Sequence, residues 1–318
     1  MKKYLITGGA GFIGSHLVDA LVDRGDSVVV LDDLSSGHLE NLARVRDRIE
    51  FIEGDIRDPD TCLRASAGCD GIFHEAALVS VADSIRRPRD NHDINLTGTV
   101  NLLEAARENG VRRMVMAGSA AVYGNEPTLP KRETMNPDPI TPYAVAKLAS
   151  EYELKTYAAM YGMEGVSLRY FNVYGPRQDP SSPYSGVISR FADALQRDDK
   201  PVIFGDGTQG RDFIYVGDVV RANLMAMDAA PGASFGIYNV GTGRETSLLK
   251  LIDVLANIFD REVQPRFEPP REGDIRHSVA AIDAIGSAFG FRPECDLAAG
   301  LKHLVGRTTD CPDGTDKK

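Results

Sequence analysis

The first 32 residues restrict the fold of this chain more than any other stretch. An apolar run over residues 4–7 leads into three glycines with the spacing Gly-x-x-Gly-x-x-Gly, at Gly8, Gly11 and Gly14, and apolar residues then recur at helical spacing. A second apolar run ends on Asp32, about 20 residues beyond the glycines. The order of strand, glycine turn, helix, strand and acid predicts a dinucleotide-binding fold.

Each residue of this motif has a physical task in holding a dinucleotide. Gly8 permits a tight turn, Gly11 lets a pyrophosphate approach the backbone, and Gly14 lets the helix pack closely on the strand. Exposed amides at the start of the helix then bind the phosphates. The Asp32 carboxylate, with Asp33 beside it, can accept hydrogen bonds from a ribose diol and would repel a 2′-phosphate, so we expect NAD rather than NADP as the cofactor.

Strand-like and helix-like stretches continue to alternate beyond the motif. Long helices are predicted over 90–109 and 142–161. The alternation is typical of a doubly wound parallel α/β sheet of the Rossmann type, with helices on both faces. Further strands are predicted at 49–52, 71–74, 113–117 and 165–170.

The pattern changes after residue 172, where loops rich in Pro, Gly and Ser separate shorter helices, predicted at 185–197 and 246–259. We expect a smaller α/β substrate lobe interleaved with the sheet domain, because a strand-like run at 237–240 can return to the main sheet. The predicted NAD-binding domain is 1–172 with 212–242, the substrate lobe is 173–211 with 243–306, and the polar tail 307–318 is predicted to be disordered.

Composition narrows the classes of function. The chain has 46 acidic and 36 basic residues and a net charge of −10, which argues against nucleic acid as its main partner. No apolar run approaches the ~18 residues that span a bilayer, and Met1 leads directly into the first strand without a signal peptide, so we expect no membrane partner and a cytoplasmic location. The four cysteines and six histidines show no metal-binding spacing, so no metal is expected.

Two candidate catalytic side chains lie four residues apart at the start of a predicted helix. Pro142 suits the first helical turn, and Tyr143 and Lys147 then share one face. A nearby ammonium group favours the phenolate, and the positive nicotinamide of NAD adds to this effect, so Tyr143 is predicted to act as a base near neutral pH. Ser119 follows a predicted strand, at the carboxyl edge where open α/β sheets bind ligands.

Taken together, Ser119, the Tyr-x-x-x-Lys pair and the glycine motif resemble the extended branch of the short-chain dehydrogenase/reductase superfamily. Three segments of the second half, Leu168–Arg177, Gly205–Phe213 and Arg271–Ser278, narrow the resemblance to nucleotide-sugar epimerases and dehydratases over nearly the whole chain. The resemblance implies an NAD-dependent enzyme that acts on a nucleotide-linked sugar, with a UDP-sugar as the expected substrate.

The same resemblance assigns contacts with the substrate and the cofactor. It implies that Asn172 contacts the sugar diphosphate and that Arg211 and Arg271 pair with its phosphates, which suits the forked guanidinium group. Asp274 and Ser278 complete the implied substrate contacts. The implied cofactor contacts, besides the glycines and the acids at 32 and 33, are Phe12, Ile13, Asp55, Ile56, Ala76, Ala77, Asn95, Tyr143, Lys147 and Tyr170.

The residues after Ser119 bear on the reaction. The family's shared first step is oxidation at C4 of the hexose, in which Tyr143 would remove the hydroxyl proton. In dTDP-glucose 4,6-dehydratases a Thr-Asp-Glu stands where this chain has Ser119, Ala120 and Ala121. Because neither alanine can act as an acid or base, the sequence favours epimerisation at C4.

Two features, one of them a departure from the pattern of 4-epimerases, keep an alternative reaction open. Many 4-epimerases of this type have further hydroxyl residues around the catalytic serine, whereas Gly118 and Ala120 flank it here. Glu126, a further catalytic candidate, could serve an elimination instead. The alternative is a UDP-GlcNAc dehydratase that forms the same 4-keto intermediate and eliminates water across C5 and C6.

Ser278 bears on the choice of sugar. Some UDP-galactose epimerases carry a bulky aromatic residue at this point, and a small residue leaves room for an N-acetyl group at C2. The resemblance therefore implies that UDP-N-acetylglucosamine (UDP-GlcNAc) is accepted at least as well as UDP-glucose.

Three further expectations come from the resemblance. The family's two long helices commonly form a dimer interface, so we expect a homodimer. A remote alternative is a non-catalytic NAD-sensing protein, but such proteins typically lose the Tyr or the Lys, and Tyr143 and Lys147 are both present. Glu75 stands where the family often has an apolar residue, and the sequence assigns it no role.

Overall fold

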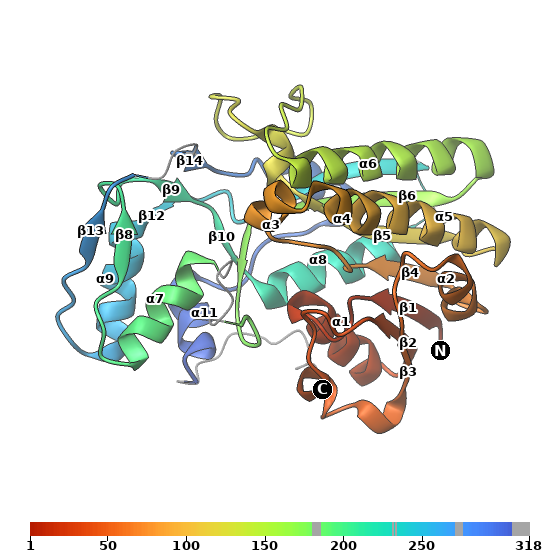
Figure 1. The fold of residues 1–318 in the computed structure, drawn as a ribbon, viewed down its shortest axis with the longest axis horizontal. Helices are drawn as coiled ribbons and strands as arrows, with labels where there is room; N and C mark the ends of the chain where they lie inside the picture. Colours follow the sequence, from red (N-terminus) through yellow and green to blue (C-terminus); the bar gives the residue numbers. More distant parts are fainter. Residues whose placement is uncertain (180–185, 231, 233, 271–275, 307–318) are drawn as a thin grey trace.

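A seven-stranded parallel sheet forms the centre of the protein (Figure 1). The computed structural model describes residues 1–179, 186–230, 232, 234–270 and 276–306. The strand order is β11-β6-β5-β4-β1-β2-β3, and every neighbouring pair is parallel, which confirms the predicted doubly wound sheet. The strands are β1 (Lys3–Thr7), β2 (Ser27–Asp32), β3 (Ile49–Glu53), β4 (Gly71–His74), β5 (Arg113–Ser119), β6 (Glu164–Tyr170) and β11 (Phe235–Val240).

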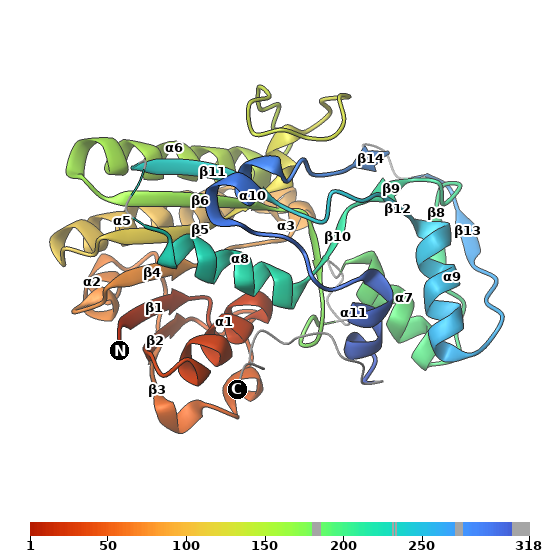
Figure 2. The same cartoon turned by 180° about the vertical axis from the view of Figure 1, so that it is seen from behind.

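Helices cover both faces of the sheet because successive side chains of each strand point to opposite faces, and both faces are apolar. Ile6 and Val30 belong to the core under helices α1 and α8, whereas Leu5 and Val29 belong to the core under α2 and α5. Figures 1 and 2 show the two sides. The helices around the sheet are α1 (Phe12–Asp23), α2 (Pro59–Ser66), α3 (Val81–Arg86), α4 (Pro88–His92), α5 (Gly98–Glu108), α6 (Pro142–Tyr161), α8 (Val216–Asp228) and α10 (Asp283–Phe289).

The two long helices differ in regularity. α6 spans Pro142–Tyr161 as predicted, and the Thr141 hydroxyl caps it by accepting a hydrogen bond from the Ala144 amide at 3.2 Å. The helix predicted over 90–109 is interrupted, because α4 passes through a π-type turn, η3 (Asp93–Thr97), before α5 begins. Such turns are frequent at functional sites, and this one carries Asn95.

A second lobe lies beyond the carboxyl ends of the strands (Figure 1). Phe191, Leu251 and Leu301, from three different helices, share its apolar core. Its helices are α7 (Val187–Gln196), α9 (Leu248–Phe259) and α11 (Leu297–Leu304), and its strands are β8 (Val202–Phe204), β9 (Gly210–Arg211), β12 (Thr246–Ser247), β13 (Arg266–Glu268) and β14 (His277–Ser278). The parallel pair of β7 (Asn172–Tyr174) and β10 (Phe213–Tyr215) lies where the chain passes between the sheet domain and this lobe.

Some predictions concern parts of the chain that are not described. Arg271, Asp274 and the tail 307–318 lie outside the described residues. Within the described ranges, no helix is both long and apolar enough to cross a membrane. In the same ranges, no group of three or more His, Cys, Asp or Glu side chains could hold a metal ion.

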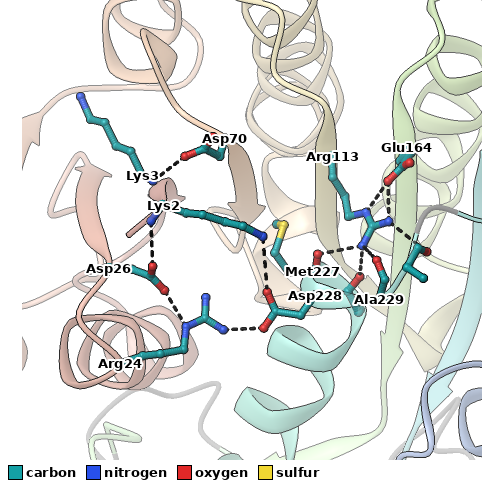
Figure 3. A network of polar contacts seen from close by, with 12 residues as sticks. Lys2, Lys3, Arg24, Asp26, Asp70, Arg113, Glu164, Met227, Asp228 and Ala229 are labelled. Atoms are coloured by element: carbon teal, nitrogen blue, oxygen red, sulfur yellow. Dashed lines mark hydrogen bonds and ion pairs between the residues drawn. The ribbon is translucent and has the colours of Figure 1, made fainter.

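Arg113 joins the amino-terminal edge of the sheet to the end of α8 (Figure 3). It is 8% exposed, and its Nη1 donates hydrogen bonds to the carbonyls of Met227 at 2.7 Å and Ala229 at 2.6 Å. Its Nε donates to Glu164 at 2.6 Å. The last carbonyls of a helix have no intrahelical partner, so this guanidinium group satisfies them.

We expect Arg113→Met to lower the free energy of unfolding by about 2–3 kcal/mol, because the substitution leaves buried carbonyls without donors. Arg112→Met is the matched control, since Arg112 is exposed and forms an ion pair with the same Glu164 at 2.8 Å. The control should cost less than about 1 kcal/mol. Urea-induced unfolding of both variants measures the difference, and equal losses would contradict the role given to Arg113.

Candidate active site

The glycine turn leaves no room for side chains. Gly8 has a φ of +66°, and a Cβ there would lie 2.7 Å from the Ala76 amide nitrogen. A Cβ on Gly14 would lie 2.2 Å from the Gly8 carbonyl oxygen, so the first turn of α1 packs directly against the glycine turn. Gly11 precedes α1 as its N-cap residue and donates its amide hydrogen to Gly8 at 3.0 Å.

A dinucleotide fits this turn. Phe12 and Ile13 contribute the first amides of α1, which have no intrahelical acceptor, and their side chains pack against the core of the second lobe. The positive end of the helix dipole at this point favours phosphate groups. The turn can therefore hold a diphosphate through backbone amides alone.

Asp32 ties the end of β2 to the glycine turn. Its two carboxylate oxygens accept hydrogen bonds from the amides of Ala10 and Leu34, each at 2.9 Å. Each carboxylate oxygen has a second lone pair, so Asp32 keeps the capacity to accept from ribose hydroxyls. Burial raises the pKa of Asp32, and the two amides oppose this shift. Asp33 is exposed and accepts hydrogen bonds from the amide and hydroxyl of Ser35.

Ser119, Tyr143 and Lys147 meet at the carboxyl end of β5. Ser119 is the last residue of β5, and the other two lie on the first two turns of α6. The Tyr143 phenol lies near enough to Ser119 for the serine hydroxyl to lower its pKa. Lys147 is 4% exposed and donates from Nζ to the carbonyl of Ala117 at 2.9 Å. The structure thus brings together three residues that the sequence separates by up to 28 positions.

The protein's own groups raise the pKa of Tyr143 instead of lowering it. Burial is the main cause of the raised pKa and the Glu75 carboxylate adds to it, while the Ser119 hydroxyl opposes both. Burial also lowers the pKa of Lys147 to about 8, against the effect of Glu75 and Glu151. In the protein alone, burial therefore outweighs the groups that favour the phenolate. The lower pKa expected with Lys147 and bound NAD together stays a prediction.

Asn95 fixes the segment that follows β4. Its Oδ1 accepts from the Leu78 amide at 2.8 Å, and its Nδ2 donates to the Leu78 carbonyl at 3.1 Å and to Asn91 at 2.8 Å. Asn91 in turn donates to the Pro142 carbonyl at 3.0 Å. The segment that carries Ala76-Ala77 is therefore held in register with the start of α6.

Asp55 and Ile56 lie at the far side of the sheet from these catalytic candidates, just after β3. The Asp55 carboxylate accepts from the amide and Nε of Arg57, both at 2.8 Å, and this lowers its pKa. Ile56 is 5% exposed and packs against α5, where a Cβ on Gly98 would lie 2.6 Å from its Cδ1. Their contact with the adenine side of the cofactor stays a prediction.

Glu75 lies beside the catalytic candidates, although the sequence assigned it no role. Its Oε1 accepts a hydrogen bond from the Tyr170 hydroxyl at 2.8 Å, and that hydroxyl accepts from Asn223 Nδ2 at 2.7 Å. Burial raises the pKa of Glu75 to about 7, opposed by Tyr170 and by the charge of Lys147. Sequence reasoning missed Glu75 and Asn223 because their shared partner comes from a third, distant part of the chain.

Glu126 remains within its own loop. Its Oε1 accepts from the Thr128 amide at 2.9 Å, which lowers its pKa, and its carbonyl accepts from the Lys131 ammonium group. Among the residues that the structure describes, no hydrogen bond or ion pair joins this carboxylate to Ser119 or Tyr143. A role for Glu126 in elimination stays a prediction.

Three of the residues predicted to contact substrate lie close together. Asn172 donates from its amide to the Asp212 carbonyl at 3.0 Å and from Nδ2 to the same oxygen at 3.3 Å. Arg211 and Ser278 are opposite each other in the pair of β9 and β14. The short stretch from Arg211 to Phe213 therefore contacts Asn172 through Asp212 and lies opposite Ser278 through Arg211. Asn172, Arg211 and Ser278 thus form one cluster.

Both the fold and the residues at the strand ends are those of a dinucleotide-dependent enzyme. The chain belongs to the NAD dependent epimerase/dehydratase family, whose model matches residues 4–241. NAD is accordingly its cofactor.

Relatives resemble the chain over almost its full length. The UDP-glucose 4-epimerase of Mycolicibacterium smegmatis is 43% identical, over 95% of this chain and 97% of the relative. A UDP-N-acetylglucosamine 4-epimerase from Methanobrevibacter ruminantium M1, solved with UDP-N-acetylmuramic acid, has a TM-score of 0.92 at 37% identity and covers 96% of this chain and 97% of its own. The Thermotoga maritima UDP-glucose 4-epimerase, solved with UDP-glucose, has a TM-score of 0.91 at 40% identity, with coverage of 96% and 98%.

Proposed function

We propose that this protein is a UDP-hexose 4-epimerase that accepts UDP-GlcNAc. The observation that carries the proposal is the meeting of Ser119, Tyr143 and Lys147 at the carboxyl end of β5, beside a turn that fits a dinucleotide. The similar proteins named above, which act on UDP-glucose or UDP-GlcNAc, support the substrate class. In this proposal the sheet domain (1–172 and 212–242) holds NAD, and the lobe (173–211 and 243–306) holds the sugar nucleotide.

The chain's own residues account for binding and proton transfer. NAD supplies a hydride acceptor and donor. Ser119 donates a hydrogen bond to the C4 oxygen of the hexose, and Tyr143 removes the proton from that oxygen. Lys147 keeps positive charge near the phenolate that Tyr143 must form. After the 4-keto sugar presents its other face, Tyr143 returns the proton to the C4 oxygen.

Asn172 and Arg211 are proposed to hold the diphosphate while the sugar turns. Arg211 lies on β9, whose other neighbour in the same small sheet is β12, so its backbone is fixed on both sides. A fixed backbone suits a guanidinium group that must keep hold of a phosphate through the turn. Arg271 and Asp274 are further candidates from the sequence alone.

The dehydratase alternative depends on Glu126 and is tested by the product. Incubation with UDP-GlcNAc in deuterated water, followed by NMR, distinguishes the two reactions. Epimerisation inverts C4 without solvent exchange at C5, whereas dehydration removes the signals of the 6-hydroxymethyl group. Loss of these signals would replace the proposed function with the alternative.

Ser278 is expected to set the choice of sugar. Turnover of UDP-GlcNAc should equal or exceed that of UDP-glucose, and Ser278→Tyr should lower UDP-GlcNAc turnover about tenfold or more through a clash with the N-acetyl group, while UDP-glucose turnover changes less. Val279→Ile, on the next residue, is the control for the added bulk. A strong preference of the unchanged protein for UDP-glucose would contradict the small-residue argument.

A homodimer formed through α5 and α6 is part of the proposal. The two helices pack beside each other on one face of the sheet (Figure 1). Val145, Met160 and Tyr161 of α6 are large apolar residues with 52%, 70% and 51% exposure. Apolar exposure of this size along one helix suits a subunit interface.

A further inference from the structure

Glu75 is a charged group of the catalytic centre that the proposed chemistry does not use. It follows β4, which lies between β1 and β5, and its amide donates to the Thr7 carbonyl at 3.2 Å. The hydrogen bond from Tyr170 at 2.8 Å orients its carboxylate, and Asn223, which is 0% exposed, holds the Tyr170 hydroxyl at 2.7 Å. The backbone and side chain of Glu75 are both fixed, so its charge has a defined place.

The titratable groups that face this carboxylate come from two elements besides its own. Tyr170 of β6 donates a hydrogen bond to it. His74 pairs with Met116 of β5, so Glu75 follows in register beside Ala117, whose carbonyl accepts from Lys147 Nζ at 2.9 Å. The charges of Glu75, Lys147 and Tyr143 accordingly influence one another. His74, the preceding residue, is buried and stays neutral because burial lowers its pKa to about 3. Lys147 is therefore the cation that Glu75 faces, and Tyr143 is the acid that its charge opposes.

We propose that Glu75 is a positioning residue that sets the charge balance of the Tyr143–Lys147 pair. The proposal rests on Tyr143 being the base, as proposed above. In its ionised form Glu75 favours the charged form of Lys147 and raises the proton affinity of Tyr143, and in its protonated form it does neither. Since the pKa of Glu75 is about 7, both forms are populated near neutral pH.

Glu75→Gln tests the proposal, because the amide keeps the volume and an oxygen that accepts from Tyr170 but cannot ionise. In infrared spectra recorded against pH, the unchanged protein should show a protonated-carboxyl band that disappears as the pH rises through about 7, and the variant should lack it. The ratio of the turnover of the variant to that of the unchanged protein should be constant below pH 6, where residue 75 carries no charge in either protein.

Above pH 7 this ratio should fall by up to about tenfold, because Lys147 without the opposing carboxylate loses its proton at a lower pH. A ratio that does not vary with pH would show that Glu75 only supports the fold. A band that persists in the variant would assign the titration to another carboxyl group. Either result overturns the proposal.

Tyr170→Phe provides a second test if the glutamine variant does not fold. The Tyr170 hydroxyl stabilises the ionised carboxylate, so its removal should move the disappearance of the band to higher pH. An unmoved band would overturn the proposal. The infrared titration needs no substrate, so its failure is separate from failure of the proposed epimerase activity.

Discussion

Tyr143→Phe should lower kcat about a thousandfold, with little change in KM. The substitution removes the phenol oxygen near Ser119 that we assign as the base, while the aromatic ring remains. The loss should fall on kcat because proton removal belongs to the chemical step and not to binding. Initial rates with UDP-GlcNAc, at saturating NAD, measure both constants.

Tyr152→Phe is the matched control for this result. Tyr152 lies on the same helix, is 56% exposed and undergoes the same loss of one oxygen. The turnover of the Tyr152→Phe variant should stay within about twofold of that of the unchanged protein. If the Tyr143 variant kept more than about a tenth of the original rate, the assigned base would be wrong.

Glu151→Gln should lower the free energy of unfolding by about 3–5 kcal/mol. Glu151 and Arg169 form an ion pair whose side chains are 1% and 2% exposed, with Nη2–Oε2 and Nε–Oε1 distances of 2.7 and 3.0 Å. The substitution leaves the Arg169 guanidinium group buried without a counter-charge. Chemical denaturation monitored by circular dichroism gives the value.

Glu153→Gln repeats the same chemical change two residues further along α6, at a less buried position. This control should change the free energy of unfolding by no more than about 0.5 kcal/mol. A loss below about 1 kcal/mol for the Glu151 variant, or equal losses for both, would show that the pair contributes little to the fold.

The sheet was predictable from the sequence because its signals are local. The glycine turn requires a positive φ at Gly8 and close packing at Gly14, and both requirements appear directly as residue types. Strands and helices around the sheet follow hydrophobic periods that a short window reveals. The pair Tyr143 and Lys147 was predictable for the same reason, since four residues on a helix define a common face.

The rest could not be predicted because it depends on contacts between distant segments. β9 and β14 contain two residues each, too few to show any period, yet they place Arg211 opposite Ser278. The group of Glu75, Tyr170 and Asn223 is assembled from the residue after β4, from β6 and from α8. The rise that burial causes in the pKa of Tyr143 in the protein alone could not be predicted either, because burial cannot be judged from the spacing of two side chains.

Gly118 illustrates how a departure in the sequence is explained by the fold. The family resemblance implies further hydroxyl residues around the catalytic serine, whereas Gly118 has no side chain, and a Cβ there would lie 2.6 Å from the Ser167 Oγ. Ser167 of β6 therefore supplies a hydroxyl group beside Gly118, and it donates to Glu151 at 3.0 Å.

In the proposed reaction, hydride leaves C4 of the sugar and returns to the same carbon, and Tyr143 carries the proton. The decisive experiment incubates UDP-GlcNAc that carries deuterium at C4 with the NAD-loaded protein in ordinary water. We predict that NMR of the product will show inverted configuration at C4 with the deuterium retained there. Loss of the deuterium to water, or inversion at a different carbon, would contradict the account.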